Sequence, residues 1–281
     1  MVSPEPLPLW VGTAGLPRAP GVEVFLLLHG YGASSFTWRS WVPSLAWRGH
    51  VVTVDMKGFG RAPKPDDGRY APADQADLVL RLIRERGLAR ITLVGHSLGG
   101  GVALYVALRL RDAGERRLDR LVVMAGAAFR QPLPPFVALA RHRRLSTLVL
   151  RVLGADVVVA QALRAIVFDP GAITTEQIRG YAAPLRDPGS LTPLFDSALQ
   201  ILPPDLDRLT SRYGEIDVPT LLLWGRQDPA VPLWVGRRLA GVLPRSTLHV
   251  LERCGHMPAD ERAPESLAAL EAFLDAHPSR R

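Results

Sequence analysis

The chain has 281 residues, 47% of them hydrophobic and 22% charged, so it can bury a large core and is neither disordered nor collagen-like. The formal charge of +7 comes almost entirely from arginine, because only Lys57 and Lys64 are lysines among 34 basic residues. The arginines are scattered and their densest cluster, Arg141, Arg143 and Arg144, is short, which excludes the basic stripe of a nucleic-acid-binding protein.

Short apolar segments rich in β-branched residues recur along the chain, each followed by a turn and a stretch with helical spacing. Their near-continuous hydrophobicity is typical of strands buried on both faces of a parallel sheet. The alternation predicts a doubly wound, mostly parallel α/β sheet, in which reactive groups gather at the carboxyl ends of the strands. The predicted strands are residues 22–29, 50–55, 91–96, 118–125, 220–224 and 246–251, and the predicted helices are residues 71–86, 98–112, 231–243 and 264–277.

A proline-rich segment interrupts this alternation between residues 129 and 213, with helical patches at 145–167 and 175–182. The segment is much longer than a crossover helix and its loops require. We therefore predict a helical cap at 129–213, inserted between the two parts of the sheet domain at 1–128 and 214–281. An ordinary long crossover is the alternative.

The motif G-x-S-x-G occupies residues 95–99, directly after a predicted strand and at the start of a predicted helix. This context is the one in which a serine hydroxyl is held out at the top of a sheet as a nucleophile. We therefore predict that Ser97 is the nucleophile, and a simple glycine turn is the alternative.

A serine needs a base to remove its proton and an acid to orient that base. Among seven histidines, His256 alone lies in the loop between the last predicted strand and the last helix. Asp228 follows the predicted strand 220–224. The other place for such an acid is the end of strand 118–125, but the residues there, up to 130, include no carboxylate. We predict these two residues as base and acid. A solvent-exposed loop histidine and a helix-capping aspartate are the alternatives, with Asp260 and Glu252 as substitute acids.

The order Ser97, Asp228, His256 is that of α/β-hydrolases. Together with the HGYG turn at 29–32 and the D-x-x-G-x-G segment at 55–60, it makes the chain resemble the α/β-hydrolase superfamily, in its capped lineage of esterases and haloperoxidase-like enzymes. The resemblance implies an α/β-hydrolase fold and an oxyanion hole formed by the backbone amides of Tyr31 and Leu98. The D-x-x-G-x-G segment is expected to be structural.

Departures from the family's patterns narrow the expected chemistry. At the G-x-S-x-G turn, called the nucleophile elbow, Ser97 stands where epoxide hydrolases and haloalkane dehalogenases have an aspartate. Met257 stands where carbon–carbon bond hydrolases usually carry tryptophan. The HGGG motif of hormone-sensitive-lipase-like esterases is absent. No metal-ligand spacing and no G-x-G-x-x-G in the first βα unit is present, so we predict neither a metal nor another cofactor.

These features predict a serine hydrolase that cleaves a carboxylic ester or similar acyl substrate through an acyl-enzyme. Carbon–carbon bond hydrolysis, perhydrolysis, acyl transfer and non-catalytic binding are alternatives on the same fold. The cap is rich in Leu, Val and Ala, which favours a small-molecule substrate with an apolar acyl or alcohol portion, although such residues also simply pack a cap.

The remaining sequence features concern the cellular compartment. The single Cys254 excludes an internal disulfide, and the amino terminus shows no secretory signal pattern. No apolar run approaches the ~20 residues of a membrane span. We therefore expect a cytoplasmic protein without a membrane span.

Overall fold

The computed structural model describes residues 6–280. Its centre is a seven-stranded sheet with the strand order β1-β3-β2-β4-β5-β6-β7, in which only β1 runs antiparallel to its neighbour. The doubly wound, mostly parallel sheet predicted from the sequence is therefore confirmed. The strands are β1 Trp10–Gly15, β2 Val24–Leu28, β3 His50–Asp55, β4 Ile91–His96, β5 Leu118–Met124, β6 Thr220–Gly225 and β7 Ser246–Leu251.

Helices cover both faces of the sheet, which explains why the inner strands β2, β4, β5 and β6 are buried at every position and are mostly apolar. In β2, Val24, Leu26 and Leu28 pack into one core cluster, whereas Phe25 and Leu27 pack into the other. The first cluster contains residues of α2 Pro72–Glu85, α3 Leu98–Asp112 and α10 Leu233–Val242, and the second contains residues of α1 Val42–Arg48 and α12 Ala263–Ala276.

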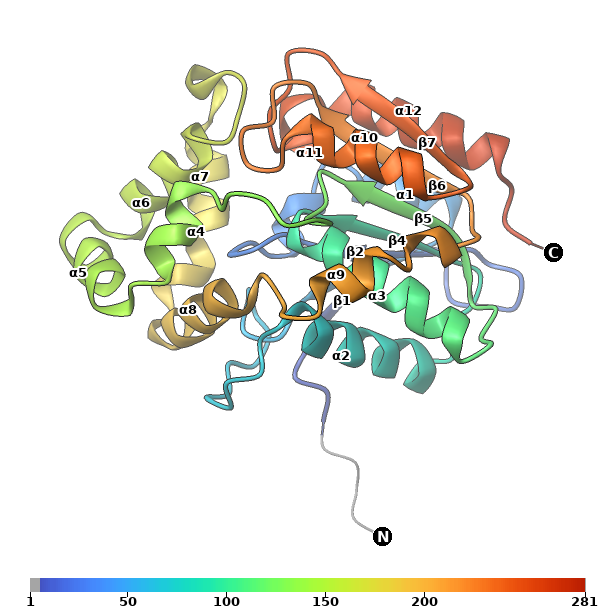
Figure 1. Cartoon of the computed structure of the whole chain (residues 1–281), viewed down its shortest axis with the longest axis horizontal. Coiled ribbons are helices and arrows are strands. Elements are labelled where there is room, and N and C mark those ends of the chain that lie inside the picture. The colour runs from blue at the N-terminus through green and yellow to red at the C-terminus, as the bar shows by residue number, and fades with distance from the viewer. Residues whose placement is uncertain (1–5, 281) are drawn as a thin grey trace, which may run out of the picture.

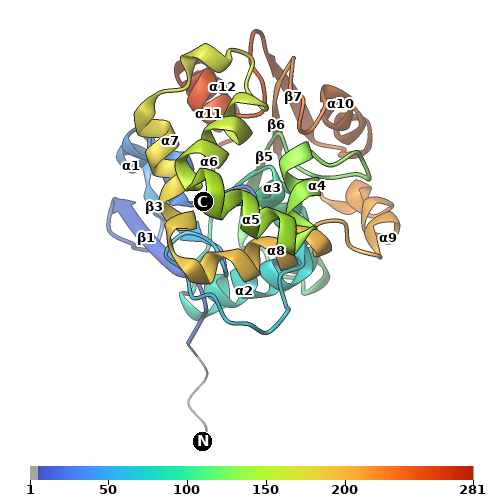
Figure 2. The same ribbon diagram turned by 90° about the vertical axis from the view of Figure 1, so that its left-hand side faces the viewer.

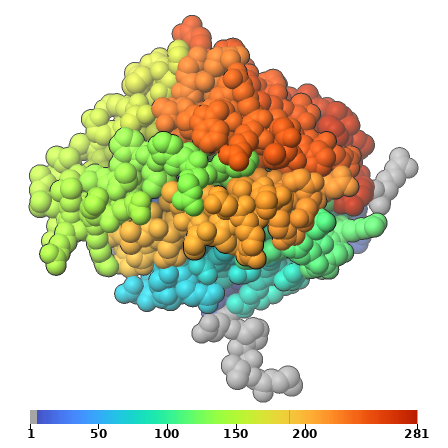
Figure 3. Space-filling view, viewed as in Figure 1, coloured from blue at the N-terminus to red at the C-terminus, as the bar shows by residue number. Residues whose placement is uncertain are grey.

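Further helices lie between β5 and β6, in the segment predicted as a cap. Figure 1 shows α4 to α8 gathered to one side of the sheet, beyond the carboxyl ends of its strands, and Figure 3 shows them forming one end of the molecule. By contrast, α9 returns to the sheet, where Leu206 and Leu209 join the first core cluster. These helices are α4 Pro135–Ala140, α5 Arg143–Leu153, α6 Ala155–Arg164, α7 Thr175–Ala182, α8 Leu191–Gln200 and α9 Leu206–Thr210.

Two local predictions need correction. The helical patch predicted at 145–167 is two helices, α5 and α6, whose axes turn by 109° at Gly154. Gly154 has φ 78° and ψ 159°, a conformation that side chains with a Cβ avoid. Strand β1 was not predicted, because it is a half-exposed edge strand with two glycines and lacks the apolar signature of the inner strands.

No single helix in residues 6–280 is long and apolar enough to cross a membrane. The sharply bent α5–α6 pair meets that criterion only when its two helices are taken together.

Candidate active site

Ser97 lies at the tight turn between β4 and α3, with φ 54° and ψ −116°. The glycines around it are required by space, because a Cβ on Gly95 would lie 2.2 Å from the carbonyl oxygen of Gly99. A Cβ on Gly99 would meet the carbonyl oxygens of Leu28 and His29 at 2.5 Å. The G-x-S-x-G spacing thus lets β4, α3 and the end of β2 approach closely while the serine projects from the turn.

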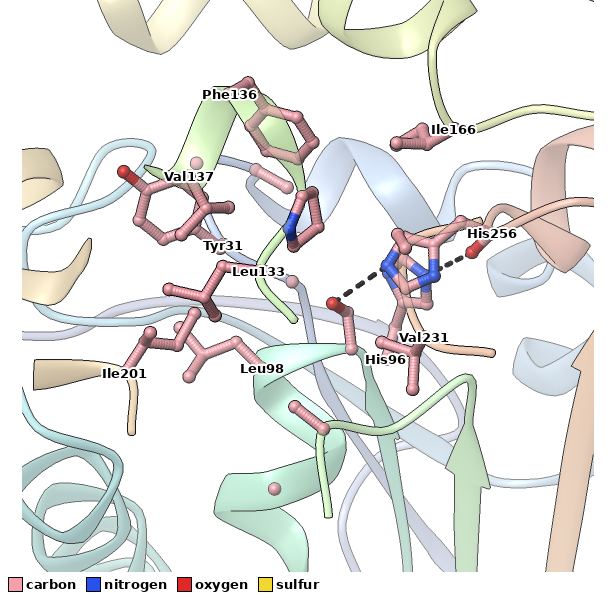
Figure 4. A pocket seen from close by; sticks show the side chains of 18 of the residues that line it. Tyr31, His96, Leu98, Leu133, Phe136, Val137, Ile166, Ile201, Val231 and His256 are labelled. Atoms are coloured by element: carbon pink, nitrogen blue, oxygen red, sulfur yellow. Dashed lines mark hydrogen bonds between the residues drawn. The ribbon is translucent and has the colours of Figure 1, made fainter. Parts of the chain in front are cut away.

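The structure brings the three residues predicted as a triad into one hydrogen-bonded chain. The Oγ atom of Ser97 lies 2.9 Å from Nε2 of His256, and Nδ1 of His256 lies 2.8 Å from Oδ2 of Asp228 (Figure 4 shows the serine contact). All three side chains belong to loops that follow parallel strands β4, β6 and β7. In this geometry the imidazole can accept the serine proton, and the buried carboxylate can hold the imidazolium that forms.

Asp228 also holds its own loop, but it does not cap α10, whose N-cap is Pro232. Its Oδ1 accepts hydrogen bonds from the backbone N–H groups of Ala230 and Val231, both at 2.8 Å, while Oδ2 faces His256. The two oxygens therefore have separate partners. The substitute acids are engaged elsewhere: Asp260 accepts from Tyr181 at 2.6 Å, and the exposed Glu252 pairs with Arg226.

The predicted oxyanion amides belong to backbone that borders Ser97. Tyr31 and Leu98 line the same cavity as Ser97, and a Cβ on Gly30 would lie 3.1 Å from the Cβ of Ser97. Leu98 is the first residue of α3, where backbone N–H groups lack partners within the helix and favour negative charge. The side-chain hydroxyl of Tyr31 is not part of this predicted oxyanion hole, because it donates to the carbonyl of Leu194 in α8 at 2.8 Å.

Two histidines in the motif turns are neutral and structural. His29 accepts from the backbone N–H of Met56 through Nε2 and donates from Nδ1 to the carbonyl of Gly30, and burial lowers its pKa. His96 donates from Nε2 to the carbonyl of His256 at 2.8 Å. Burial, followed by the nearby positive charge of protonated His256, lowers the pKa of His96 to about 3. His96 is therefore uncharged at neutral pH and supports the backbone of His256 (Figure 4).

Glu261, which sequence reasoning missed, clamps the loop that carries His256. Its carboxylate accepts from the backbone N–H groups of Gly255 and Met257 at 2.9 Å each, and from that of Phe168 at 2.7 Å. The N–H of His256 in turn donates to the carbonyl of Ile166 at 2.7 Å. The histidine loop is thereby fixed to the segment after α6. The only sequence signal was an acidic residue near the start of α11 Pro258–Glu261, a common feature of helices.

The cavity above Ser97 has a volume of about 200 Å³ and lies between the sheet edge and the inserted helices. Within residues 6–280, no Asp, Glu, Lys or Arg side chain lines it. Figure 4 shows Leu133, Val137 and Ile201 together with Tyr31 on the side away from His256. In the same residues, no three His, Cys, Asp or Glu side chains converge as metal ligands do.

The fold, the elbow and the three loops at the sheet edge define an α/β-hydrolase. The chain belongs to the α/β-hydrolase family, whose sequence model matches residues 25–270. It is 30% identical to 2-hydroxy-6-oxononadienedioate/2-hydroxy-6-oxononatrienedioate hydrolase 2 of Pseudomonas putida over 249 residues, which cover 86% of this chain and 84% of that protein.

Two solved structures resemble the chain over nearly its whole length. An α/β-hydrolase fold protein from Burkholderia ambifaria superposes with a TM-score of 0.81 at 25% identity, covering 95% of this chain and 93% of its own. A membrane phospholipase A described as a bacterial virulence factor superposes with a TM-score of 0.75 at 26% identity, covering 97% and 84%.

Glu261→Gln should lower the reactivity of Ser97 toward a fluorophosphonate roughly tenfold while the protein stays folded. The amide nitrogen would face at least one backbone N–H group, and an unsatisfied buried donor costs about 1–3 kcal/mol. Labelling rate and melting temperature measure the two effects. The control is Glu265→Gln, an exposed glutamate of α12. An unchanged labelling rate in Glu261→Gln would show that the clamp does not position His256.

Proposed function

We propose that this hydrolase cleaves a carboxylic ester through an acyl-enzyme, with Ser97 as nucleophile, His256 as general base and Asp228 as the residue that orients it. The proposal rests chiefly on the continuous hydrogen-bonded chain from Ser97 Oγ to Asp228 Oδ2. His256 takes the serine proton as Oγ attacks the carbonyl carbon, then gives it to the departing alcohol. It next deprotonates the water that releases the acid.

The amides of Tyr31 and Leu98 are the proposed donors to the oxyanion. Both are backbone groups in tightly packed turns, so they are fixed before negative charge develops on the substrate oxygen. The ring of His96 donates to the backbone carbonyl of His256 and helps to hold the base in place, and its pKa of about 3 makes it too weak a base to take the serine proton itself.

The absence of cationic side chains from the described cavity wall supports a neutral, apolar substrate. A carboxylate buried there would lose its hydration and gain no ion pair. The volume of about 200 Å³ lies below the ~300–1,000 Å³ of typical ligand pockets, which favours a substrate of modest size. Since His256 must reach the leaving group, the acyl portion belongs on the opposite side, among Leu133, Val137 and Ile201.

Carbon–carbon bond hydrolysis is the second candidate, favoured by the 30% identity to the Pseudomonas putida enzyme. The substrate in that enzyme's name is a dioate and carries two carboxylates, which the uncharged cavity wall does not suit. The phospholipase among the structural relatives acts on esters, in line with the first candidate. Turnover of p-nitrophenyl esters, compared with a 2-hydroxy-6-oxo-dienoate under the same conditions, discriminates between the two.

Ser97→Ala should abolish covalent labelling by a fluorophosphonate and hydrolysis of p-nitrophenyl butyrate, because no nucleophile remains at the elbow. Mass spectrometry of the intact chain measures the adduct. Ser211→Ala, at an exposed serine outside the cavity, serves as the control and should label fully. Stoichiometric labelling of the Ser97→Ala chain would assign the nucleophile to another residue.

Asp228→Asn should lower kcat by as much as ~10⁴-fold with little loss of stability. The asparagine Oδ1 can still accept from Ala230 and Val231, so we expect the free energy of unfolding to change by under about 1 kcal/mol. The amide nitrogen would then donate to Nδ1 of His256 and leave the proton on Nε2, where it blocks the base. A folded variant with near-wild-type kcat would remove Asp228 from the triad.

Val137→Phe should shorten the acyl chain that the enzyme prefers, because the larger ring fills the side of the cavity away from His256. We expect kcat/KM for octanoyl esters to fall at least tenfold relative to acetyl esters. The matched control is Val242→Phe on the surface of α10, which should leave the ratio unchanged. An unchanged ratio in Val137→Phe would place the acyl chain elsewhere.

A further inference from the structure

The outward face of α5 carries an apolar stripe that nothing in residues 6–280 covers. Leu145, Leu148 and Val152 are spaced three and four residues apart, so they lie on one side of the helix, with Leu153 at its end. Their exposed fractions are 49%, 58%, 72% and 51%. Isolated exposed apolar residues are ordinary, but three leucines and a valine on an eleven-residue helix form a patch of the kind found at interaction sites.

The charges around this stripe are almost all positive. Residues 141–164 contain five arginines and one aspartate, and Arg186 already pairs with that aspartate, Asp156. Arg144 and Arg151 lie along one edge of the stripe by helical spacing. Neither forms an ion pair with a carboxylate in the described part of the chain. The surface therefore combines exposed hydrophobic side chains with uncompensated positive charge.

The same helix reaches the cavity with its inner side. Leu150 of α5 and Val158 of α6 line the cavity wall, while Ser146 is buried and bonded to the carbonyl of Leu139 at 2.7 Å. Figures 1 and 2 place α5 at the outer end of the molecule, on the far side of the insertion from the sheet. A surface that covered the stripe would thus lie about one helix diameter, ~10 Å, from the cavity.

We propose that the stripe on α5 docks onto the surface of an anionic lipid bilayer, and that the enzyme takes its ester substrate from that surface. That the ester substrate comes from the membrane rests on the proposed function, whereas docking of the stripe does not. The boundary between acyl chains and negatively charged headgroups supplies both interactions that the stripe offers, apolar burial and contact with arginine. A helix of eleven residues lies along such a boundary and does not span it.

The test is co-sedimentation of the whole chain with vesicles. Vesicles of phosphatidylcholine mixed with phosphatidylglycerol should carry the protein down, and vesicles of phosphatidylcholine alone should bind it far more weakly. Raising the salt from about 0.1 M to about 1 M shortens the screening length from ~10 Å to ~3 Å and should release most of the protein. The same measurement on Ser97→Ala should give unchanged binding, so that docking is judged separately from catalysis.

Two double variants separate the apolar and the charged contributions. Leu148→Asp with Val152→Asp should abolish sedimentation, and Arg144→Gln with Arg151→Gln should weaken it roughly 25-fold, since each arginine near an anionic surface contributes a factor of about five. The matched controls are Val242→Asp on α10 and Arg116→Gln, an exposed arginine before β5. All variants should keep the wild-type melting temperature and the wild-type rate on p-nitrophenyl acetate, because none of these residues lines the cavity.

Three results would overturn the proposal. The first is that the wild-type chain remains in the supernatant with anionic vesicles. The second is that the folded α5 variants sediment as the wild type does. In the third, the wild-type chain forms a dimer on size exclusion that the Leu148→Asp, Val152→Asp variant loses, without binding vesicles. That result would assign the stripe to a contact between two copies of the chain.

Discussion

Parallel strand pairing is the constraint on which the proposed site depends, because it brings the carboxyl ends of neighbouring strands to a single edge of the sheet. Ser97 and His256 are 159 residues apart in the chain, yet their loops follow β4 and β7 at that edge. Asp228 follows β6, the direct neighbour of β7, and reaches the imidazole from there. The hydrogen-bonded chain is therefore held by the register of a buried sheet, whose order changes only if the core unfolds.

The inserted helices are fastened to the same edge through the loops that carry the proposed catalytic groups. His256 donates its N–H to Ile166, Glu261 accepts from Phe168, and Tyr31 donates its hydroxyl to Leu194. Burial raises the pKa of Tyr31 well above its ordinary value, so this last donor keeps its proton at neutral pH. Each bond joins one segment of the insertion to one loop of the sheet. A shift of the insertion therefore alters both the cavity wall and the position of the base.

The sequence was most informative where one physical requirement dominates a position. Inner strands must be largely apolar on both faces, and the elbow must have glycine where an added Cβ would lie within 2.5 Å of a neighbouring carbonyl oxygen, so both were predictable. The break at Gly154 was missed because apolar spacing continues on both sides of it, and a lone glycine is tolerated within helices. The role of Glu261 could not be predicted, because its partners are backbone N–H groups, two in the neighbouring histidine loop and one, that of Phe168, 93 residues away. Such contacts leave no pattern in side-chain types.

The positive charge of the chain lies outside the cavity, whose described wall has no Asp, Glu, Lys or Arg side chain. Arginine lies outside the described cavity wall, so the oxyanion and the imidazolium that develop beside Ser97 in the proposed reaction have no charged Arg, Lys, Asp or Glu side chain lining the cavity with them. In a wall of low polarity these two charges and Asp228 interact more strongly than they would in water. An arginine inside the cavity would stabilise the carboxylate of an acid product and slow its release. Its exclusion favours entry of a neutral ester and departure of the charged acid, while exposed arginines such as Arg144 and Arg151 remain available to attract anionic partners.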